Sequence, residues 1–212
     1  MLITVDKLIS IAEYNRIEPV IIVTKADLNG EYADTLCQTY RLCGFSVFRV
    51  SRDDDTSIIP IKEFIASYLP NRTAAFAGAS GVGKSTLMNR LFPEMPMLKT
   101  SEVSRKTERG RHTTRSVELF PLGNKAGCGY IADTPGFSLI DFERFDFFPK
   151  AELTFTMREF EKYSANCRYS DCTHTKEEGC AVLEAVKRGE IPKSRHDSFI
   201  EMYNELKAKK IR

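Results

Sequence analysis

A glycine-rich segment that ends in Lys and Ser is the part of the chain whose residue types and spacing best suit chemistry. Residues 78–85 read Gly-Ala-Ser-Gly-Val-Gly-Lys-Ser and match the pattern G-x-x-x-x-G-K-[ST]. Glycines let such a loop wrap closely around phosphates, while its backbone N–H groups and the start of the next helix point at the anion. Lys84 would neutralise phosphate charge, and Ser85 would hold Mg²⁺. The predicted phosphate-binding residues are Gly78, Ala79, Ser80, Gly81, Val82, Gly83, Lys84, Ser85 and Thr86.

An acidic residue at the end of a later predicted strand fits the same chemistry. Asp133 begins the sequence Asp-Thr-Pro-Gly and could hold Mg²⁺ directly or through water. The N–H of Gly136 could reach a terminal phosphate. Alone these four residues would be an ordinary turn, but after a phosphate-binding loop the nucleotide interpretation is favoured.

The residues Thr24-Lys25-Ala26-Asp27 follow an apolar run and resemble the [NT]-K-x-D motif of guanine nucleotide-binding proteins. The Asp27 carboxylate could accept hydrogen bonds from guanine N1–H and the 2-amino group, which adenine does not offer. Lys25 would lay its stem along the base, and Thr24 replaces the commoner Asn, so we expect one side-chain contact to weaken. Ser51 fits an accessory base-contacting serine, although Arg52 departs from the usual small residue. The alternative is a solvated turn after a strand.

Three cysteines and one histidine form a cluster near the C-terminus. They are spaced Cys167-x4-Cys172-x-His174-x5-Cys180, within fourteen residues. Three thiols and one imidazole are the ligand set of a closed tetrahedral zinc site. Because a full set leaves no position open for a catalytic water, the sequence predicts one structural zinc ion.

Alternating helical and strand patterns must position these residues. Apolar residues at helical spacing predict helices over 5–12, 32–40 and 61–68, and β-branched or apolar runs predict strands at 20–23, 45–50, 73–77, 117–120 and 129–132. This alternation predicts an α/β fold with a mostly parallel sheet. The tail after Ala181 is expected to be helical in two pieces around Pro192. We expect a nucleotide-binding domain over residues 1–150 and a small helical zinc-binding domain over 151–212.

Composition narrows the classes of function. The 212 residues carry 31 basic and 29 acidic side chains, for a net charge of +2. This balance excludes bulk polycation binding, so any nucleic-acid contact must come from local patches. No apolar run is long enough to span a membrane, and the N-terminal region lacks a signal-peptide layout. We therefore expect a cytoplasmic protein with reduced cysteines.

The order of the motifs is unusual, because ordinary GTPases carry the phosphate loop first and the base-reading motif last. The reverse order indicates a circular permutation, which a doubly wound sheet tolerates when its original termini lie close together. Taken together, the motifs resemble the circularly permuted ribosome-assembly GTPases of the RsgA (YjeQ) family. The matching segments are Ile17–Val20, Thr24–Asp27, Gly78–Thr86, Arg109–Thr114, Asp133–Phe137 and the cluster of three cysteines and His174.

The resemblance implies a three-layer, circularly permuted P-loop GTPase domain followed by a small α-helical zinc-binding domain. It implies an enzyme that hydrolyses GTP to GDP and phosphate, with Mg²⁺, late in maturation of the small (30S) ribosomal subunit. Its activity would be stimulated by that subunit, and it would bind ribosomal RNA. The expected partners are GTP or GDP and the small subunit with its RNA. We expect a monomer with no membrane contact.

Catalytic roles also come from the resemblance. Phe137 stands where many GTPases carry a Gln that orients water, and a phenyl ring forms no such hydrogen bond. The family is thought to use a His from the basic loop, here His112, with Thr113 or Thr114 reaching the metal beside Lys84. The alternative is that His112 contacts RNA phosphate. The basic segment Lys99–Arg115 could bind RNA or simply be solvated.

The sequence departs from the family at its start. The family carries an N-terminal oligonucleotide-binding β-barrel and a strand before the first helix, and neither is found here. Without that strand we expect an inner gap beside the phosphate-loop strand. Either Met1–Thr4 supplies a strand stub, or a partner supplies the strand, or the chain is a fragment, and we favour a truncated form. The rival functions are a zinc-dependent RNA-binding module with a vestigial nucleotide site and a P-loop ATPase.

Overall fold

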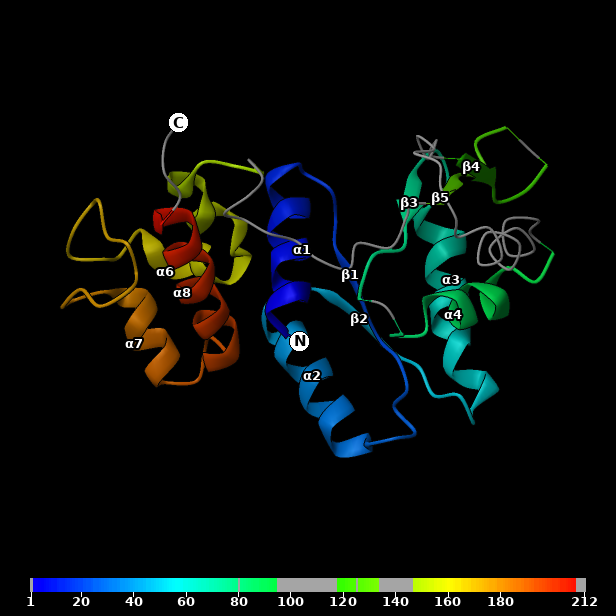
Figure 1. Cartoon of the computed structure of the whole chain (residues 1–212), viewed down its shortest axis with the longest axis horizontal. Coiled ribbons are helices and arrows are strands. Elements are labelled where there is room, and N and C mark those ends of the chain that lie inside the picture. Colours follow the sequence, from blue (N-terminus) through cyan, green and yellow to red (C-terminus); the bar gives the residue numbers. More distant parts are fainter. Residues whose placement is uncertain (1, 80, 95–117, 125, 134–146, 209–212) are drawn as a thin grey trace, which may run out of the picture. The chain divides into compact units, whose positions relative to one another are not determined.

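The fold is described from a computed structural model that covers residues 2–79, 81–94, 118–124, 126–133 and 147–208 (Figure 1). For Glu118 and Asp133 this description is limited to the backbone. The described residues form two compact units. Those within 1–23, 29–49 and 139–212 make up unit 1, and those within 24–28 and 50–138 make up unit 2.

The first part of unit 1 is two helices around a two-stranded parallel sheet. Its elements in chain order are α1 (Leu2–Tyr14), β1 (Val20–Val23), α2 (Gly30–Leu42) and β2 (Ser46–Arg49). Helix α2 begins where the Asn29 side chain accepts the N–H of Tyr32 at 3.0 Å, as expected of an N-cap. Strands β1 and β2 pair in parallel, with Val20 opposite Ser46. Their shared core contains Ile9, Cys37, Tyr40, Cys43, Phe45 and Val47.

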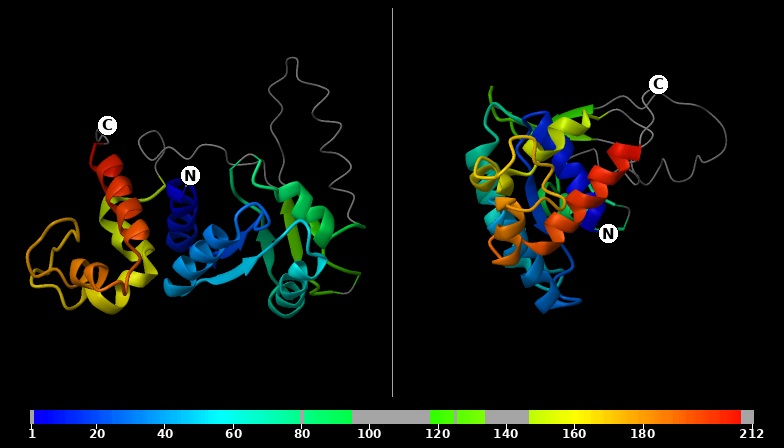
Figure 2. Two further views of the ribbon diagram at one scale, coloured as in Figure 1. Left: turned by 90° about the horizontal axis from the view of Figure 1, so that it is seen from below. Right: turned by 90° about the vertical axis from the view of Figure 1, so that its left-hand side faces the viewer.

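The second part of unit 1 is helical and surrounds its own apolar core. Its elements are η2 (Lys150–Thr156), η3 (Arg158–Phe160), α6 (Glu161–Ser164), α7 (Ala181–Lys187) and α8 (Lys193–Ala208). Phe160, Val182 and Phe199 are fully buried at its centre. Helix α1 contacts α8 and η2, and Figure 2 shows α1 and α8 side by side. The break between α7 and α8 confirms the prediction of two helices around Pro192.

Unit 2 contains a three-stranded sheet with β5 at its centre. Its elements are η1 (Asp55–Ile58), α3 (Ile59–Tyr68), β3 (Thr73–Ala75), α4 (Lys84–Leu91), β4 (Glu118–Pro121) and β5 (Tyr130–Asp133). Strand β5 pairs in parallel with β3 and antiparallel with β4. Ile131 of β5 is fully buried and packs with Leu69 and Met88. This core packs α4 against the sheet that contains β3, the strand that leads into the glycine-rich loop.

The observed elements confirm the α/β prediction, since two of the three strand pairings among the described residues are parallel. The strands form two separately hydrogen-bonded sheets, β1–β2 and β3–β5–β4. Within the described residues, no strand pairs with the outer edge of β3, which is where the sequence predicts a gap.

One expected source of the missing strand is wrong, because residues Leu2–Thr4 form the first turn of α1. The helix is favoured there because Ile3, Leu8 and Ile11 recur at helical spacing and pack against the C-terminal core. Within the described residues, no helix is long and apolar enough to cross a bilayer. The domain division at residues 1–150 and 151–212 stays a prediction.

Candidate nucleotide site and metal centre

The glycine-rich loop has the backbone shape that its sequence requires. Gly81 and Gly83 have φ values of +78° and +97°, in the left-handed region that side chains disfavour. Gly83 is the N-cap of α4, and no side chain caps that helix. The N-terminal N–H groups of α4 therefore lie at the end of the loop without a competing side-chain acceptor, as an anion-binding helix start requires.

Lys84 folds back over the loop from the first position of α4. Its Nζ donates to the carbonyl oxygens of Gly78 at 2.7 Å and Ala79 at 2.8 Å. Partial burial lowers the pKa of this ammonium. The cation is held against the loop itself, which is where phosphate charge would need to be neutralised. Ser85 and Thr86 follow as exposed residues in the first turn of α4.

The segment after β1 is hydrogen-bonded directly to the glycine-rich loop. Thr24 Oγ1 donates to the carbonyl of Val82 at 2.5 Å, and Lys25 Nζ donates to the carbonyl of Gly81 at 2.7 Å. Thr24, which stands where Asn is commoner, thus still supplies a side-chain hydrogen bond. Two motifs more than fifty residues apart in sequence are joined into one candidate site.

Asp27 is held by the turn that follows β2. Its Oδ1 accepts the backbone N–H of Arg52 at 2.9 Å and the hydroxyl of Ser51 at 3.4 Å. The Arg52 N–H is the main reason that the pKa of Asp27 lies below its usual value. The carboxylate is exposed and ionised at neutral pH, as an acceptor for a base N–H must be. Ser51 therefore lies beside Asp27, and its predicted contact with a base stays a prediction.

Sequence reasoning did not single out Arg90, which lies in the last turn of α4. Its guanidinium donates to the carbonyl oxygens of Ser51 at 2.8 Å and Asp54 at 2.9 Å. No sequence pattern marks this contact, because it joins residues 39 positions apart. It ties the helix of the phosphate loop to the turn that holds Asp27.

Several predicted site residues lie outside the described residues. These are Ser80, His112, Thr113, Thr114 and Gly136, together with the segment 99–115 and Phe137. Asp133 ends β5, and its side chain is outside the description. Their roles stay predictions.

The predicted metal ligands converge in unit 1. The donor atoms of Cys167, Cys172, His174 and Cys180 all lie within 4.8 Å of one another. Cys180 Sγ is 3.4 Å from His174 Nδ1 and 3.8 Å from Cys167 Sγ. A tetrahedron with zinc bonds of about 2.0–2.3 Å has edges of about 3.3–3.8 Å. The four side chains therefore fit a tetrahedral metal ion.

Burial shapes the acid–base state of the metal ligands. It raises the pKa of the Cys172 thiol to about 12 and lowers the pKa of His174. Burial alone thus favours the neutral forms of Cys172 and His174, and the Cys172 thiolate would form in response to a cation.

Glu177 organises the loop that carries His174. Its carboxylate accepts the backbone N–H groups of Thr173 and Thr175, each at 3.0 Å, and of Lys176 at 3.1 Å. The Thr173 hydroxyl donates to it as well. Burial alone would raise the pKa of Glu177, but these hydrogen bonds outweigh it and bring the pKa to about 2. Sequence reasoning missed this residue, although an acidic side chain between two ligands was a usable signal.

His174 itself is in a left-handed conformation, with φ of +55°. Its carbonyl oxygen accepts Nε2–H of the buried His196 at 2.8 Å. The Arg168 N–H closes the loop by donating to the carbonyl of Gly179 at 3.0 Å. Gly179 is required there, since its φ is +76° and an added Cβ would lie 2.9 Å from Arg168 Cβ.

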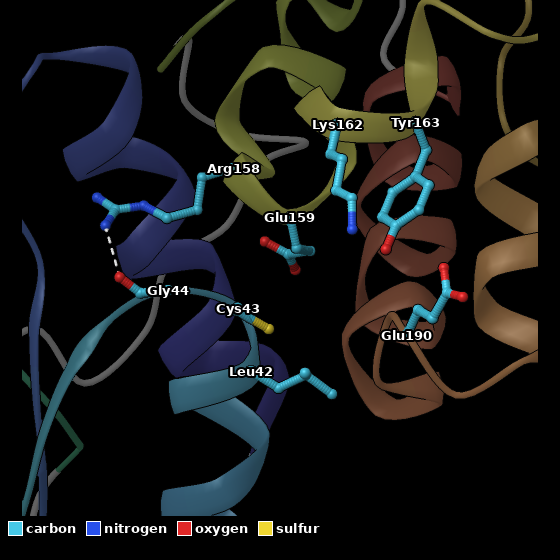
Figure 3. Close-up of a pocket in the computed structure, with 8 residues that line it drawn as sticks. All are labelled: Leu42, Cys43, Gly44, Arg158, Glu159, Lys162, Tyr163 and Glu190. Atoms are coloured by element: carbon cyan, nitrogen blue, oxygen red, sulfur yellow. Dashed lines mark hydrogen bonds between the residues drawn. The ribbon is translucent and has the colours of Figure 1, made fainter.

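A cavity of about 380 Å³ in unit 1 is no alternative site (Figure 3). Its carboxylates and its guanidinium are already paired with protein groups. Arg158 pairs with Glu13 and Glu18, Glu159 with Arg195, and Glu190 with Arg188. These three charged side chains are therefore already paired, which makes the cavity a poor site for a charged ligand.

Comparisons with known proteins agree with the geometry. The model of the RsgA GTPase family matches residues 2–143. The small ribosomal subunit biogenesis GTPase RsgA of Caldanaerobacter subterraneus subsp. tengcongensis is 41% identical over 211 residues, which cover 99% of this chain and 68% of that protein. The protein of the same name from Bacillus subtilis is 37% identical over 212 residues, 98% of this chain and 67% of its own length.

Two solved structures also resemble this chain in fold. YloQ, described as a circularly permuted GTPase, matches with a TM-score of 0.73 and 32% identity over 100% of this chain and 65% of its own. YjeQ from Thermotoga maritima matches with a TM-score of 0.75 and 30% identity, over 99% of this chain and 67% of its own. The chain thus spans about two thirds of the length of these relatives, and the predicted permuted fold is confirmed. The chain belongs to the RsgA GTPase family.

Proposed function

We propose that this protein hydrolyses GTP to GDP and phosphate during late maturation of the small ribosomal subunit. One observation carries the nucleotide chemistry: Thr24 and Lys25 are hydrogen-bonded to the glycine-rich loop, so that a phosphate site and a base-reading carboxylate share one unit. The family and the names of the relatives support the ribosomal role.

The phosphate end of GTP would bind at the start of α4. Backbone N–H groups of residues 78–85 would surround the phosphates, and Lys84 would move from its loop carbonyls to phosphate oxygens. Ser85, Asp133 and either Thr113 or Thr114 would hold Mg²⁺, with the Gly136 N–H near the terminal phosphate. Bound with GTP, Mg²⁺ would neutralise developing charge on the β- and γ-phosphates.

The base end would be read by Asp27. An ionised carboxylate accepts hydrogen bonds from guanine N1–H and the 2-amino group, and adenine presents no matching pair of donors. Lys25 would pack its stem along the base, with Ser51 as a neighbour. Guanine is therefore favoured over adenine, which disfavours the ATPase alternative.

The attacking water would be oriented by His112, since Phe137 has no hydrogen-bonding group. We expect His112→Ala to lower subunit-stimulated turnover while GTP binding persists, as measured by phosphate release and nucleotide titration. Unchanged stimulated turnover would favour the alternative that His112 contacts RNA.

The cluster of three cysteines and His174 would hold one structural zinc ion, because four protein donors complete a tetrahedron. Its loop belongs to the C-terminal domain that we place at residues 151–212. This domain would help the protein, a cytoplasmic monomer, to dock on ribosomal RNA or protein.

Phosphate release by the whole chain, with and without purified small subunits, tests the proposal. We expect hydrolysis of GTP but little of ATP, and faster hydrolysis with subunits. Asp27→Asn should move base preference toward xanthine nucleotides, which offer an acceptor where guanine has the 2-amino donor. RNA binding without GTP turnover under either condition would instead support the rival RNA-binding module.

A further inference from the structure

Arg90 joins the two halves of the candidate nucleotide site. It lies on α4, which starts at Lys84, and its side chain is 20% exposed. The guanidinium donates through NH1 to the carbonyl of Ser51, and through NH2 to the carbonyl of Asp54 and to the Asp55 carboxylate at 3.1 Å. One cation thus spans three acceptors on a single turn.

The turn whose carbonyl groups accept hydrogen bonds from Arg90 also donates hydrogen bonds to Asp27. Ser51 supplies a hydroxyl and Arg52 a backbone N–H to Asp27 Oδ1. The carbonyl of Ser51 belongs to the peptide group whose N–H is that of Arg52. A bond from Arg90 to that carbonyl therefore orients the same peptide plane that donates to Asp27.

The geometry points to Arg90 as a positioning residue that sets selectivity for the guanine base. It would act through the Ser51–Arg52 peptide on Asp27, without touching the nucleotide. This inference rests on the proposed function and adds to it a residue that determines specificity. It also couples the two ends of the site, because the helix that begins at the phosphates carries the cation that orients the base-reading turn.

Two features of the chemistry favour the planar fork of arginine at this position. Hydrogen bonds from a cation to carbonyl oxygens are stronger than neutral ones. A guanidinium offers several donors in fixed directions, whereas a lysine ammonium is a point charge on a flexible stem. The pair with Asp55 contributes little by itself, because the Asp55 side chain is 98% exposed.

The test compares dissociation constants for GDP, IDP and inorganic pyrophosphate in the whole 212-residue chain. IDP lacks the 2-amino group that would donate a hydrogen bond to Asp27. The ratio of the IDP and GDP dissociation constants therefore measures how well Asp27 is positioned. Pyrophosphate reports on the phosphate loop alone. The variants are Arg90→Met and Arg90→Lys, with Asp55→Asn to remove only the ion pair. Arg72→Met, on an arginine stacked over Tyr68 in the same unit, is the matched control.

We expect Arg90→Met to weaken GDP binding about tenfold, to reduce the IDP-to-GDP ratio and to leave pyrophosphate binding within about twofold. Arg90→Lys should reduce the IDP-to-GDP ratio by a similar amount. Asp55→Asn and Arg72→Met should leave this ratio near its wild-type value. A wild-type ratio in a folded Arg90 variant would overturn the inference, as would an equal loss for pyrophosphate. If Arg90→Met does not fold, Arg90→Lys decides. Equal binding of GDP and ADP by the unmodified chain would instead mark failure of the proposed function itself.

Discussion

The candidate nucleotide site of unit 2 and the cysteine–histidine cluster of unit 1 each contain a carboxylate held by hydrogen bonds, but they are built differently. Glu177 accepts four hydrogen bonds from donors within four residues of itself. Asp27 accepts its bonds from a turn about 25 residues away, and its exposed side chain remains able to meet a ligand.

This difference separates a local structure from an assembled one. The metal loop places all four ligands and the supporting carboxylate within residues 167–180. The nucleotide site joins three segments, 24–27, 51–55 and 78–85, through contacts from Thr24, Lys25 and Arg90. Apart from the bond that His196 makes to the His174 carbonyl, we therefore expect the metal loop to withstand changes elsewhere in the chain. We expect the candidate nucleotide site to be sensitive to distant residues.

Loss of a metal ligand should have the largest effect. We expect Cys180→Ser to lower the free energy of unfolding by more than about 4 kcal/mol, because metal binding contributes directly to folding. Serine can still accept the N–H of Leu183 as the N-cap of α7, so the loss would report on the metal. Thermal melts with metal analysis measure it, and Cys128→Ser, outside the cluster, is the control. A stable variant with full metal content would contradict a tetrahedral site.

Removing the buried cation of unit 1 should have the next largest effect. Arg195 is 1% exposed and pairs with Glu159 at 2.8 Å and with Asp6. Arg195→Met would leave two buried carboxylates without their partner, and we expect a loss of about 3–5 kcal/mol. Arg188→Met, which removes an exposed pair with Glu190, should leave the free energy of unfolding nearly unchanged. In folded Arg195→Met, metal affinity should stay near wild type, and a large fall would show that the metal loop is not local.

Lys84→Ala should lower GTP hydrolysis by at least about 100-fold, since it removes a cation aimed at developing phosphate charge. Metal content and the melting temperature should change little, because the cluster lies in the other unit. Steady-state phosphate release and metal analysis test both halves of this prediction. Residual hydrolysis close to wild type would argue against a phosphate role for Lys84.

Glu177→Gln should have the smallest effect of the four. An amide keeps the shape of the side chain but loses the charge that binds three N–H groups, so we expect metal affinity to fall about tenfold. Competition with a chromophoric chelator measures this affinity. Glu178→Gln, at the neighbouring position, is the control. Equal affinities for both variants would mean that the backbone holds His174 without Glu177.

The sequence predicted the parts of the molecule whose information is local. The glycines of residues 78–83, the spacing of the four metal ligands and the apolar strands each follow from neighbouring residues. One of its three alternatives for the missing strand, a stub at Met1–Thr4, is wrong, because Leu2–Thr4 form the first turn of a helix whose apolar residues pack on the C-terminal core. It also missed Arg90 and Glu177, which act through hydrogen bonds rather than through a motif.

By itself, the sequence determined which groups could do chemistry, because residue type sets charge, donor and acceptor. It also determined that the base-reading motif precedes the phosphate loop. Only the tertiary structure decided that Thr24 and Lys25 donate to the loop carbonyls and that Arg90 donates to the turn beside Asp27. The physical reason is distance along the chain. Thr24, Lys25 and Arg90 meet partners that are 58, 56 and 39 residues away, and no short pattern encodes such contacts.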